Sequence, residues 1–225
     1  SRALVAEGAD SWFFITADYA YGHSLERETS NHVTTAGGKV LGSVRTPFPG
    51  TTDFSSFLIR AQASGAKVLG LANGGSDTIN CIKQASEFGL AKHGMKIAGL
   101  VFLIADVYSL GLEVTQGVLL SEPFYWDLND GTRTFSKQFG ARLGGRMPGM
   151  DHAGIYSGVL HYLKAVSAMG AEAAKASGRA TVEKMKAIPT DDPLFGKGSI
   201  RLDGRKIHPM YLFQVKAPSE SKGGW

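Results

Sequence analysis

The chain has 225 residues, of which 43% are hydrophobic and 20% charged, a composition that suits a globular protein with a substantial core. Its formal net charge is +4, and because Lys and Arg are scattered rather than clustered, we expect no nucleic-acid surface. No apolar run reaches the length of a membrane span. The single cysteine, Cys81, excludes an internal disulfide, and we expect it to be a buried structural thiol.

The first half of the chain alternates apolar runs with amphipathic stretches. Such alternation predicts right-handed β-α-β units and therefore an α/β fold. The helix expected at 53–64 should bury one face, formed by Phe54, Phe57, Leu58 and Ala61. The helix expected at 76–88 should bury Ile79, Ile82, Ala85 and Phe88. The expected strands lie at 12–16, 39–45, 67–72 and 95–100, and the expected helices at about 24–36, 53–64 and 76–88.

The second half contains helices without intervening strands. Its clearest helix, 151–169, shows Ile155, Val159, Tyr162, Leu163 and Val166 on one face, which we expect to be buried. Helices alone cannot complete a doubly wound sheet, so we expect them to need a partner sheet that the chain does not contain. The other expected elements are a short helix at 107–112, an extended segment at 117–125, helices at 132–143 and 181–187, and a hairpin over 199–215 that turns at Asp203-Gly204.

Two expected strand ends place candidate ligand contacts on one edge of the sheet, because ligands of parallel sheets bind beyond the carboxyl ends of strands. Tyr21 lies in the polar loop 17–22 after the first strand. Its ring can stack on an apolar ligand while its hydroxyl hydrogen-bonds, although a surface tyrosine is the alternative. Asn73, Gly74 and Gly75 join the third strand to a helix. They either hold a ligand or simply form a tight turn.

The fourth strand end and the following segment supply further candidates. Phe102 or Leu103 is expected to form a wall of the pocket. Asp106 is expected either to accept a hydrogen bond from a ligand or to cap the short helix that begins at Val107, and we favour the cap. Phe124 and Tyr125, next to Trp126, either line an aromatic pocket or pack in a core. His152, beside the expected N-cap Asp151, is a further candidate ligand contact.

Sequence signatures of catalysis are absent. The chain has no G-x-S-x-G elbow, no G-x-G-x-x-G after the first strand and no Walker loop. Its six histidines form no pair at metal-ligand spacing. The run Asp127–Gly131 fails as a calcium loop because Thr132 stands where glycine is required. We therefore expect no enzyme activity, no cofactor and no metal.

Three stretches carry a family resemblance: WFFITADYAYGHSLE, TTDFSSFLIRAQASGAKVLGLANGGSDTINCIKQASEFG and FGKGSIRLDGRKIHPMYLFQVK. With them the chain resembles, over nearly all its length, the periplasmic solute-binding proteins of branched-chain amino acid ABC transporters, the leucine/isoleucine/valine-binding group. The segments FYWDLND and YSGVLHYLKAV look most like a bacterial subgroup that binds aromatic carboxylates.

The resemblance implies a two-lobed clamshell of the type I periplasmic-binding-protein fold. Residues 1–121 would be the core of lobe two, 122–194 a crossover with helices returning to lobe one, and 195–225 a hairpin returning to lobe two. The first stretch of the family is absent, so lobe one would be partial and only half of a ligand site present. Tyr21 matches the family's Tyr-Gly pair. Phe102 stands near the place of an acidic group that holds the ammonium in amino-acid binders, which favours an aromatic acid as ligand.

The resemblance also implies a function. The chain would be the periplasmic solute-binding component of an ABC importer, a monomer with its signal peptide removed. It would bind a small carboxylate and deliver it to a membrane permease. The carboxylate would be an aromatic acid of the hydroxybenzoate or phenylpropanoid type, or a branched-chain amino acid. A ligand-sensing receptor module of the same fold is one alternative. An α/β enzyme is another, although Tyr21, Asn73 and Asp106 have no partnered base or nucleophile.

Overall fold

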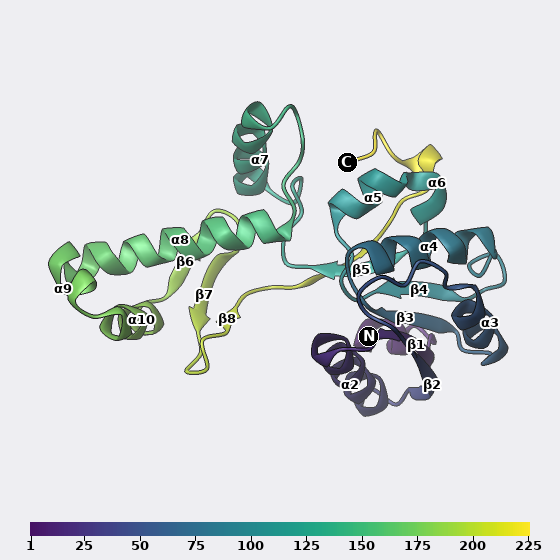
Figure 1. The fold of residues 1–225 in the computed structure, drawn as a ribbon. Coiled ribbons are helices and arrows are strands. Elements are labelled where there is room, and N and C mark those ends of the chain that lie inside the picture. Colours follow the sequence, from purple (N-terminus) through teal and green to yellow (C-terminus); the bar gives the residue numbers. More distant parts are fainter. The chain divides into compact units, whose positions relative to one another are not determined.

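The computed structural model describes residues 1–225, and the contacts within it divide the chain into two compact units (Figure 1). Unit 1 comprises residues 1–121 and 212–225, and unit 2 comprises residues 122–211. No helix in either unit combines the length and the apolar character that crossing a bilayer requires.

Unit 1 is built on a six-stranded sheet with the order β2-β1-β3-β4-β5-β9. Strands β1 to β5 pair in parallel. The central strands β1 and β3 are apolar nearly throughout and buried along almost their whole length, as expected for strands that helices cover on both faces. The strands are β1 (Ser11–Ala17), β2 (Lys39–Thr46), β3 (Val68–Ala72), β4 (Lys96–Gly99), β5 (Leu119–Glu122) and β9 (Tyr211–Gln214).

Two hydrophobic cores lie on the two faces of this sheet. Phe13 and Ile15 of β1 pack with residues of α3 and α4, whereas Trp12 and Phe14 pack in the other core with residues of α1 and α2. Successive side chains of a strand point to opposite faces, so one short strand anchors both layers and the α/β fold class is confirmed. The helices are α1 (Arg2–Ala6), α2 (Ala20–Thr35), α3 (Ser55–Ala63), α4 (Ser76–Glu87), α5 (Ile104–Leu110), α6 (Leu112–Thr115) and the 3-10 turn η1 (Pro218–Glu220).

Two details of unit 1 differ from the sequence prediction. Helix α2 begins at Ala20, so Tyr21 lies in its first turn and not in a loop. The predicted buried face of α4 is wrong at its two ends. Phe88, expected to be buried, is 36% exposed, whereas Asp77 and Thr78, which the prediction did not include, are buried. The buried positions continue through Cys81, Ile82 and Ala85, and a polar pair at the start of that stripe gives no hydrophobic signal.

Unit 2 consists of four helices and a small sheet of antiparallel strands in the order β6-β7-β8. The predicted hairpin turns as expected, with Ser199 opposite Ile207 and Ile200 opposite Lys206. Its second arm ends at Ile207, however, and Tyr211–Gln214 is the separate strand β9 at the edge of the six-stranded sheet. The elements are α7 (Asp130–Arg142), α8 (Met150–Met169), α9 (Ala171–Ala176), α10 (Gly178–Ala187), β6 (Thr190–Asp192), β7 (Gly196–Ile200) and β8 (Lys206–Ile207).

The predicted buried face of α8 is wrong. Ile155 is 71% exposed and Leu163 54% exposed, and Val159 and Tyr162 are exposed as well. The face that packs against α10 and β6 is instead formed by small or polar residues: Ala153, Ser157, His161 and Ala165. Hydrophobic periodicity identifies the apolar face of a helix, but the contacts within unit 2 are made by the opposite one.

Candidate functional site

The candidate site lies at the carboxyl edge of the unit 1 sheet. The ends of β1 and β2 are joined there, because the backbone N–H of Asp18 donates to the carbonyl of Thr46 over 2.8 Å. Strand β3 pairs with β1 up to its last residue, Ala72. The residues that follow β1, β2 and β3 therefore share one edge of the sheet, as the sequence predicted for Tyr21 and Asn73.

Gly22 explains how Tyr21 reaches this edge. A Cβ on Gly22 would lie 2.2 Å from the carbonyl oxygen of Ala17 and 3.1 Å from that of Ala72. Only glycine lets the first turn of α2 approach the ends of β1 and β3 so closely. Gly22 thus fixes the helical turn that carries Tyr21 at this edge of the sheet.

Three aromatic side chains, Tyr19, Tyr21 and Phe48, form a cluster at this edge. The ring of Tyr19 stacks on that of Phe48, with 4.1 Å between centroids and 11° between planes. Tyr19 also lies 6.1 Å from the ring of Tyr21. Tyr21 is 51% exposed, so this aromatic cluster, Tyr19, Tyr21 and Phe48, offers a ring face to a flat apolar ligand. The sequence prediction included Tyr21 and missed the other two.

Polar groups without partners lie at the end of β3 and the start of α4. Asn73 is fully buried; its Oδ1 accepts a 2.7 Å hydrogen bond from Thr78, but its Nδ2 has no partner. Asp77 is 1% exposed, and its Oδ2 has no partner either. Burial raises the pKa of the Asp77 carboxyl. Burial also raises the pKa of the Tyr19 phenol, with further contributions from Tyr21 and Asp77, so these polar groups and the aromatic cluster act on one another.

Gly74 and Gly75 begin α4. Gly75 has φ +59°, a conformation that favours glycine, and it occupies the N-cap without a side-chain cap. A Cβ on Gly74 would only reach ordinary contact with Val101, at 3.6 Å. Helix N-termini favour anions, and here Asp77 already supplies one in the first turn. This end of the site is therefore poor at binding a second negative charge.

The two remaining unit 1 candidates have structural partners. Phe102 is 2% exposed and packs in the core beside α3 and α4, folded back onto Gly99. Asp106 accepts a 2.9 Å hydrogen bond from the backbone N–H of Leu103 through Oδ2. Asp106 thus caps α5, as the sequence favoured, but from the third position of a helix that begins at Ile104 and not from the position before a helix at Val107. A ligand contact of either residue stays a prediction.

Unit 2 holds the other three candidates. Phe124 is fully buried and meets Phe135 edge-on, with 6.1 Å between ring centroids. Tyr125 packs beside Trp126, 5.7 Å between centroids, in a segment that is not a strand. His152 accepts a 3.2 Å hydrogen bond from the Gly149 backbone N–H and so caps α8. The candidates thus fall into one group in each unit, and the ligand contacts of this second group also stay predictions.

A polar cluster in unit 2 escaped the sequence prediction. Ser157 donates to Asp192 Oδ2 over 2.6 Å, and the Lys206 ammonium donates to the same oxygen over 2.8 Å. The cluster borders a cavity of about 710 Å³ that Phe195 and His208 also line. Ser157, Asp192 and Lys206 lie 14 to 49 positions apart in the chain, so no local sequence motif predicts the cluster.

This cluster is an ionic lock and not a catalytic triad. Burial opposes the ionisation of Asp192, but hydrogen bonds from Lys206, Ser157 and the backbone N–H groups of Phe195 and Leu194 outweigh it and lower the pKa of the carboxyl. A nucleophilic serine needs a base that accepts its proton, and a carboxylate stabilised by four donors is a weak base. The cluster instead ties α8, β6 and β8 together.

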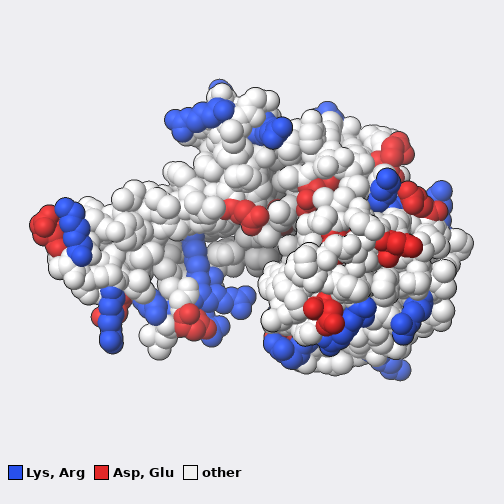
Figure 2. Space-filling model, viewed as in Figure 1, with Lys and Arg blue, Asp and Glu red and all other residues white.

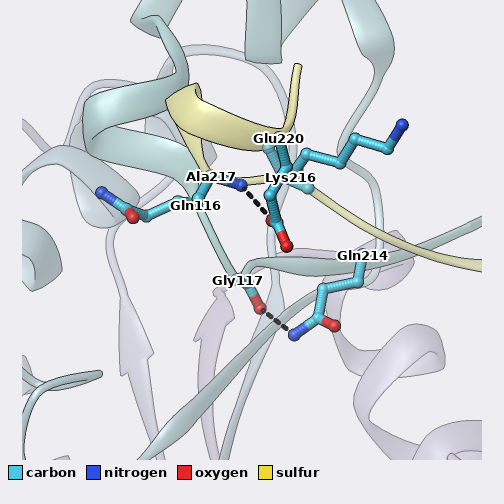
Figure 3. A pocket seen from close by; sticks show the side chains of 7 residues that line it. Gln116, Gly117, Gln214, Lys216, Ala217 and Glu220 are labelled. Atoms are coloured by element: carbon cyan, nitrogen blue, oxygen red, sulfur yellow. Dashed lines mark hydrogen bonds between the residues drawn. The ribbon is translucent and has the colours of Figure 1, made fainter.

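A second cavity of about 710 Å³ lies in unit 1, and it also lacks convergent chemistry (Figure 3). Glu220 accepts a 3.0 Å hydrogen bond from the Ala217 backbone N–H, and Gln214 donates to the Gly117 carbonyl at 3.5 Å. The Lys216 ammonium points away from these groups (Figure 3). The polar side chains here serve the local backbone.

Neither the charged side chains nor the potential metal ligands cluster in a way that would indicate another class of site. On the face in Figure 2, blue and red side chains are interspersed over unit 1 and form no single-sign stripe. No three or more His, Cys, Asp or Glu residues come together in a way that could hold a metal ion.

Comparisons with known proteins identify the fold. The sequence model of one family, described as periplasmic binding protein, matches residues 2–224. A comparison with curated proteins found no match. Among solved structures, a periplasmic binding protein from Burkholderia mallei is 46% identical over 99% of this chain and 57% of its own, with a TM-score of 0.85.

Two further structures extend the comparison. A branched chain amino acid ABC transporter periplasmic ligand-binding protein from Burkholderia xenovorans LB400 is 40% identical over 99% of this chain and 58% of its own, with a TM-score of 0.84. A solute binding protein of an ABC transporter from Rhodopseudomonas palustris HaA2, in complex with p-hydroxybenzoic acid, shares the fold with 24% identity over 96% of this chain and 58% of its own, with a TM-score of 0.82. The chain thus spans a little under three fifths of the length of these relatives.

Proposed function

The chain belongs to the periplasmic binding protein family, and on that premise we propose that it is part of the solute-binding component of an ABC importer whose ligand is an aromatic carboxylate. In this function the protein binds its solute in the periplasm and presents it to a membrane permease. No bond is made or broken, so the residues of the site act only through contact, hydrogen bonding and charge.

The aromatic cluster supports an aromatic ligand. Tyr19 and Phe48 are already stacked in parallel at 4.1 Å, and Tyr21 exposes half of its surface beside them. Offset or tilted ring contacts each contribute about 0.5–1.5 kcal/mol beyond the burial of area. A planar ring gains such contacts, whereas the branched side chain of leucine or valine gains only burial.

The charges at this edge orient the ligand. Asp77 places a buried carboxyl at the start of α4, and like charges in a dry site repel strongly. The ligand's carboxylate therefore points away from α4, and its ring and the opposite end face unit 1. Relatives in complex with benzoate, 4-hydroxybenzoate and 3,4-dihydroxy benzoic acid lend support to this ligand class, although at 19–24% identity they share only the fold.

A thermal-shift panel on the complete gene product tests the proposal. A ligand that binds only the native state raises the melting temperature by mass action, by an amount equivalent to about 2.7 kcal/mol at a hundredfold excess over Kd. We expect shifts with benzoate and 4-hydroxybenzoate and none with leucine or valine. Shifts with the amino acids alone would contradict the aromatic assignment, and no shift with any of the four would contradict the ligand class altogether.

A further inference from the structure

Asp77 is a buried carboxyl for which the fold supplies no hydrogen-bond donor to Oδ2. Burying a carboxylate without a partner is costly, and native proteins almost always pair such a group. Asp192 in the same chain illustrates the normal case, because four donors surround its carboxylate. The contrast marks Asp77 as a group whose acceptor is not used within the fold.

The helix terminus does not account for Asp77. A carboxylate in the first turn gains about 0.3–1 kcal/mol from the helix dipole at an exposed site, which needs neither burial nor an orphaned oxygen. Asp77 has a hydroxyl residue on each side in sequence, Ser76 and Thr78; Oδ2 accepts from neither, and Thr78 Oγ1 is committed to Asn73 Oδ1 over 2.7 Å. Neither the dipole nor these neighbours satisfy Oδ2.

The surroundings of Asp77 are those of a binding edge. Asp77 follows the Asn73–Gly75 turn at the end of β3, and its charge acts on the phenol of Tyr19, which stacks on Phe48 in the aromatic cluster. The amide Nδ2 of Asn73, also buried, is unpartnered as well. Two orphaned polar atoms therefore accompany the rings that would hold an aromatic ligand.

Resting on the proposed function, we propose that Asp77 determines specificity by accepting a hydrogen bond from a ring hydroxyl of the bound aromatic acid. The hydroxyl lies at the end of the ring opposite the ligand's carboxylate, which the charge of Asp77 repels. Because Oδ2 is covered, the incoming ring has to displace side chains at this edge. Unhydroxylated acids bind without this bond.

Calorimetric titration of the complete gene product with 4-hydroxybenzoate and benzoate isolates the bond, because the two acids differ by one hydroxyl. The proteins to compare are the natural protein, Asp77→Asn and Asp77→Ala. Glu113→Gln is the matched control, since Glu113 is an exposed first-turn acid of α6 in the same unit. Circular dichroism checks that each variant folds, and Asp77→Asn, which preserves shape, keeps the test valid if Asp77→Ala does not fold.

A hydrogen bond to a charged group predicts that the natural protein and Glu113→Gln favour 4-hydroxybenzoate over benzoate by about 10- to 150-fold. We expect the preference to fall to about 2- to 10-fold in Asp77→Asn and to vanish in Asp77→Ala, while the Kd for benzoate changes less than about threefold. An unchanged preference in Asp77→Asn would overturn the inference, and so would equal losses for both acids, which indicate a structural role.

The same titrations separate this inference from the proposed function. If benzoate and 4-hydroxybenzoate bind the natural protein equally well, the proposed ligand class stands and the role of Asp77 is wrong. If neither acid binds and leucine does, the proposed function fails, and the hydroxyl assignment fails with it.

Discussion

Gly22 lies so close to Ala17 that a Cβ on the glycine would stand 2.2 Å from the alanine carbonyl oxygen. The first turn of α2 is thereby pressed against the ends of β1 and β3, and Tyr21 is carried to the candidate site. The close contact between Gly22 and Ala17 explains why the residue after Tyr21 has to be a glycine.

Gly22→Ala is therefore expected to destabilise unit 1 by about 1–3 kcal/mol, because the added methyl group overpacks against backbone atoms that cannot move aside easily. Urea unfolding followed by circular dichroism measures the change. Gly74→Ala is the control, since its Cβ would make only ordinary contact with Val101 at 3.6 Å. Equal stability of the two variants would contradict the close approach.

Tyr21 is expected to contribute to binding mainly through its ring. Tyr21→Ala should weaken 4-hydroxybenzoate binding by about tenfold or more, because stacking and apolar burial are both lost. Tyr21→Phe keeps the ring and should cost no more than the roughly 2- to 12-fold of one neutral hydrogen bond. Calorimetric titration measures both, and an equal loss in Tyr21→Phe and Tyr21→Ala would show that the hydroxyl, not the ring, carries the contact.

The ionic lock of unit 2 should make stability depend on pH. The pKa of Asp192 is lowered in the fold by hydrogen bonds that outweigh its burial, so its contribution to stability is fully present above the unfolded pKa of about 3.9. That contribution is lost as the pH falls through the lower folded value. The urea midpoint of the natural protein should therefore approach that of Asp192→Asn as the pH is lowered from 7 to 3.

At pH 7 we expect Asp192→Asn to cost about 2–3 kcal/mol, since it removes a buried partner of Lys206 and Ser157. Asp191→Asn is the matched control, because Asp191 is exposed and adjacent in the chain. A cost that is equal for the two variants at pH 7 would rule out the lock.

Asp77 should show the opposite pH dependence. Burial raises the pKa of its carboxyl, so its ionisation opposes folding, and stability is lost as the pH rises from the unfolded value of about 3.9 through the folded one. The natural protein should lose stability relative to Asp77→Asn between pH 3 and pH 7. Urea midpoints across this range test the sign, and a natural protein that gains relative to the variant would show that Asp77 has a partner in the fold.

Cys81 is expected to be unreactive in the native protein. Its side chain is fully buried in the core beneath α4, and this burial, with the charge of Asp77, raises the pKa of its thiol. Because the thiolate is the reactive form, 5,5′-dithiobis(2-nitrobenzoate) at pH 8 should label no thiol in buffer and one per chain in urea. Rapid labelling without urea would contradict the packing of α4.

The elements of unit 1 were predictable because local signals and tertiary contacts agree. The apolar runs of β1 and β3 and the Asn73–Gly75 turn indicate a parallel sheet and the edge where the candidate site lies. Asp77 was not predictable, since an acid in the first turn of a helix is the usual exposed choice. Its burial depends on the packing of α4 against the strand ends.

Unit 2 was harder to predict for a different reason. The apolar side chains of α8, such as Ile155 and Leu163, show where the helix is apolar but not which face unit 2 itself contacts. The lock of Ser157, Asp192 and Lys206 joins residues far apart in sequence, and only the folded structure brings them together. Tyr19 and Phe48 likewise meet through the pairing of β1 with β2.

The binding of an aromatic carboxylate is tested most directly by calorimetric titration of the complete gene product with 4-hydroxybenzoate, with leucine titrated in parallel. We predict saturable one-to-one binding of 4-hydroxybenzoate and no heat of binding with leucine. Saturable binding of leucine without binding of 4-hydroxybenzoate would contradict the assignment.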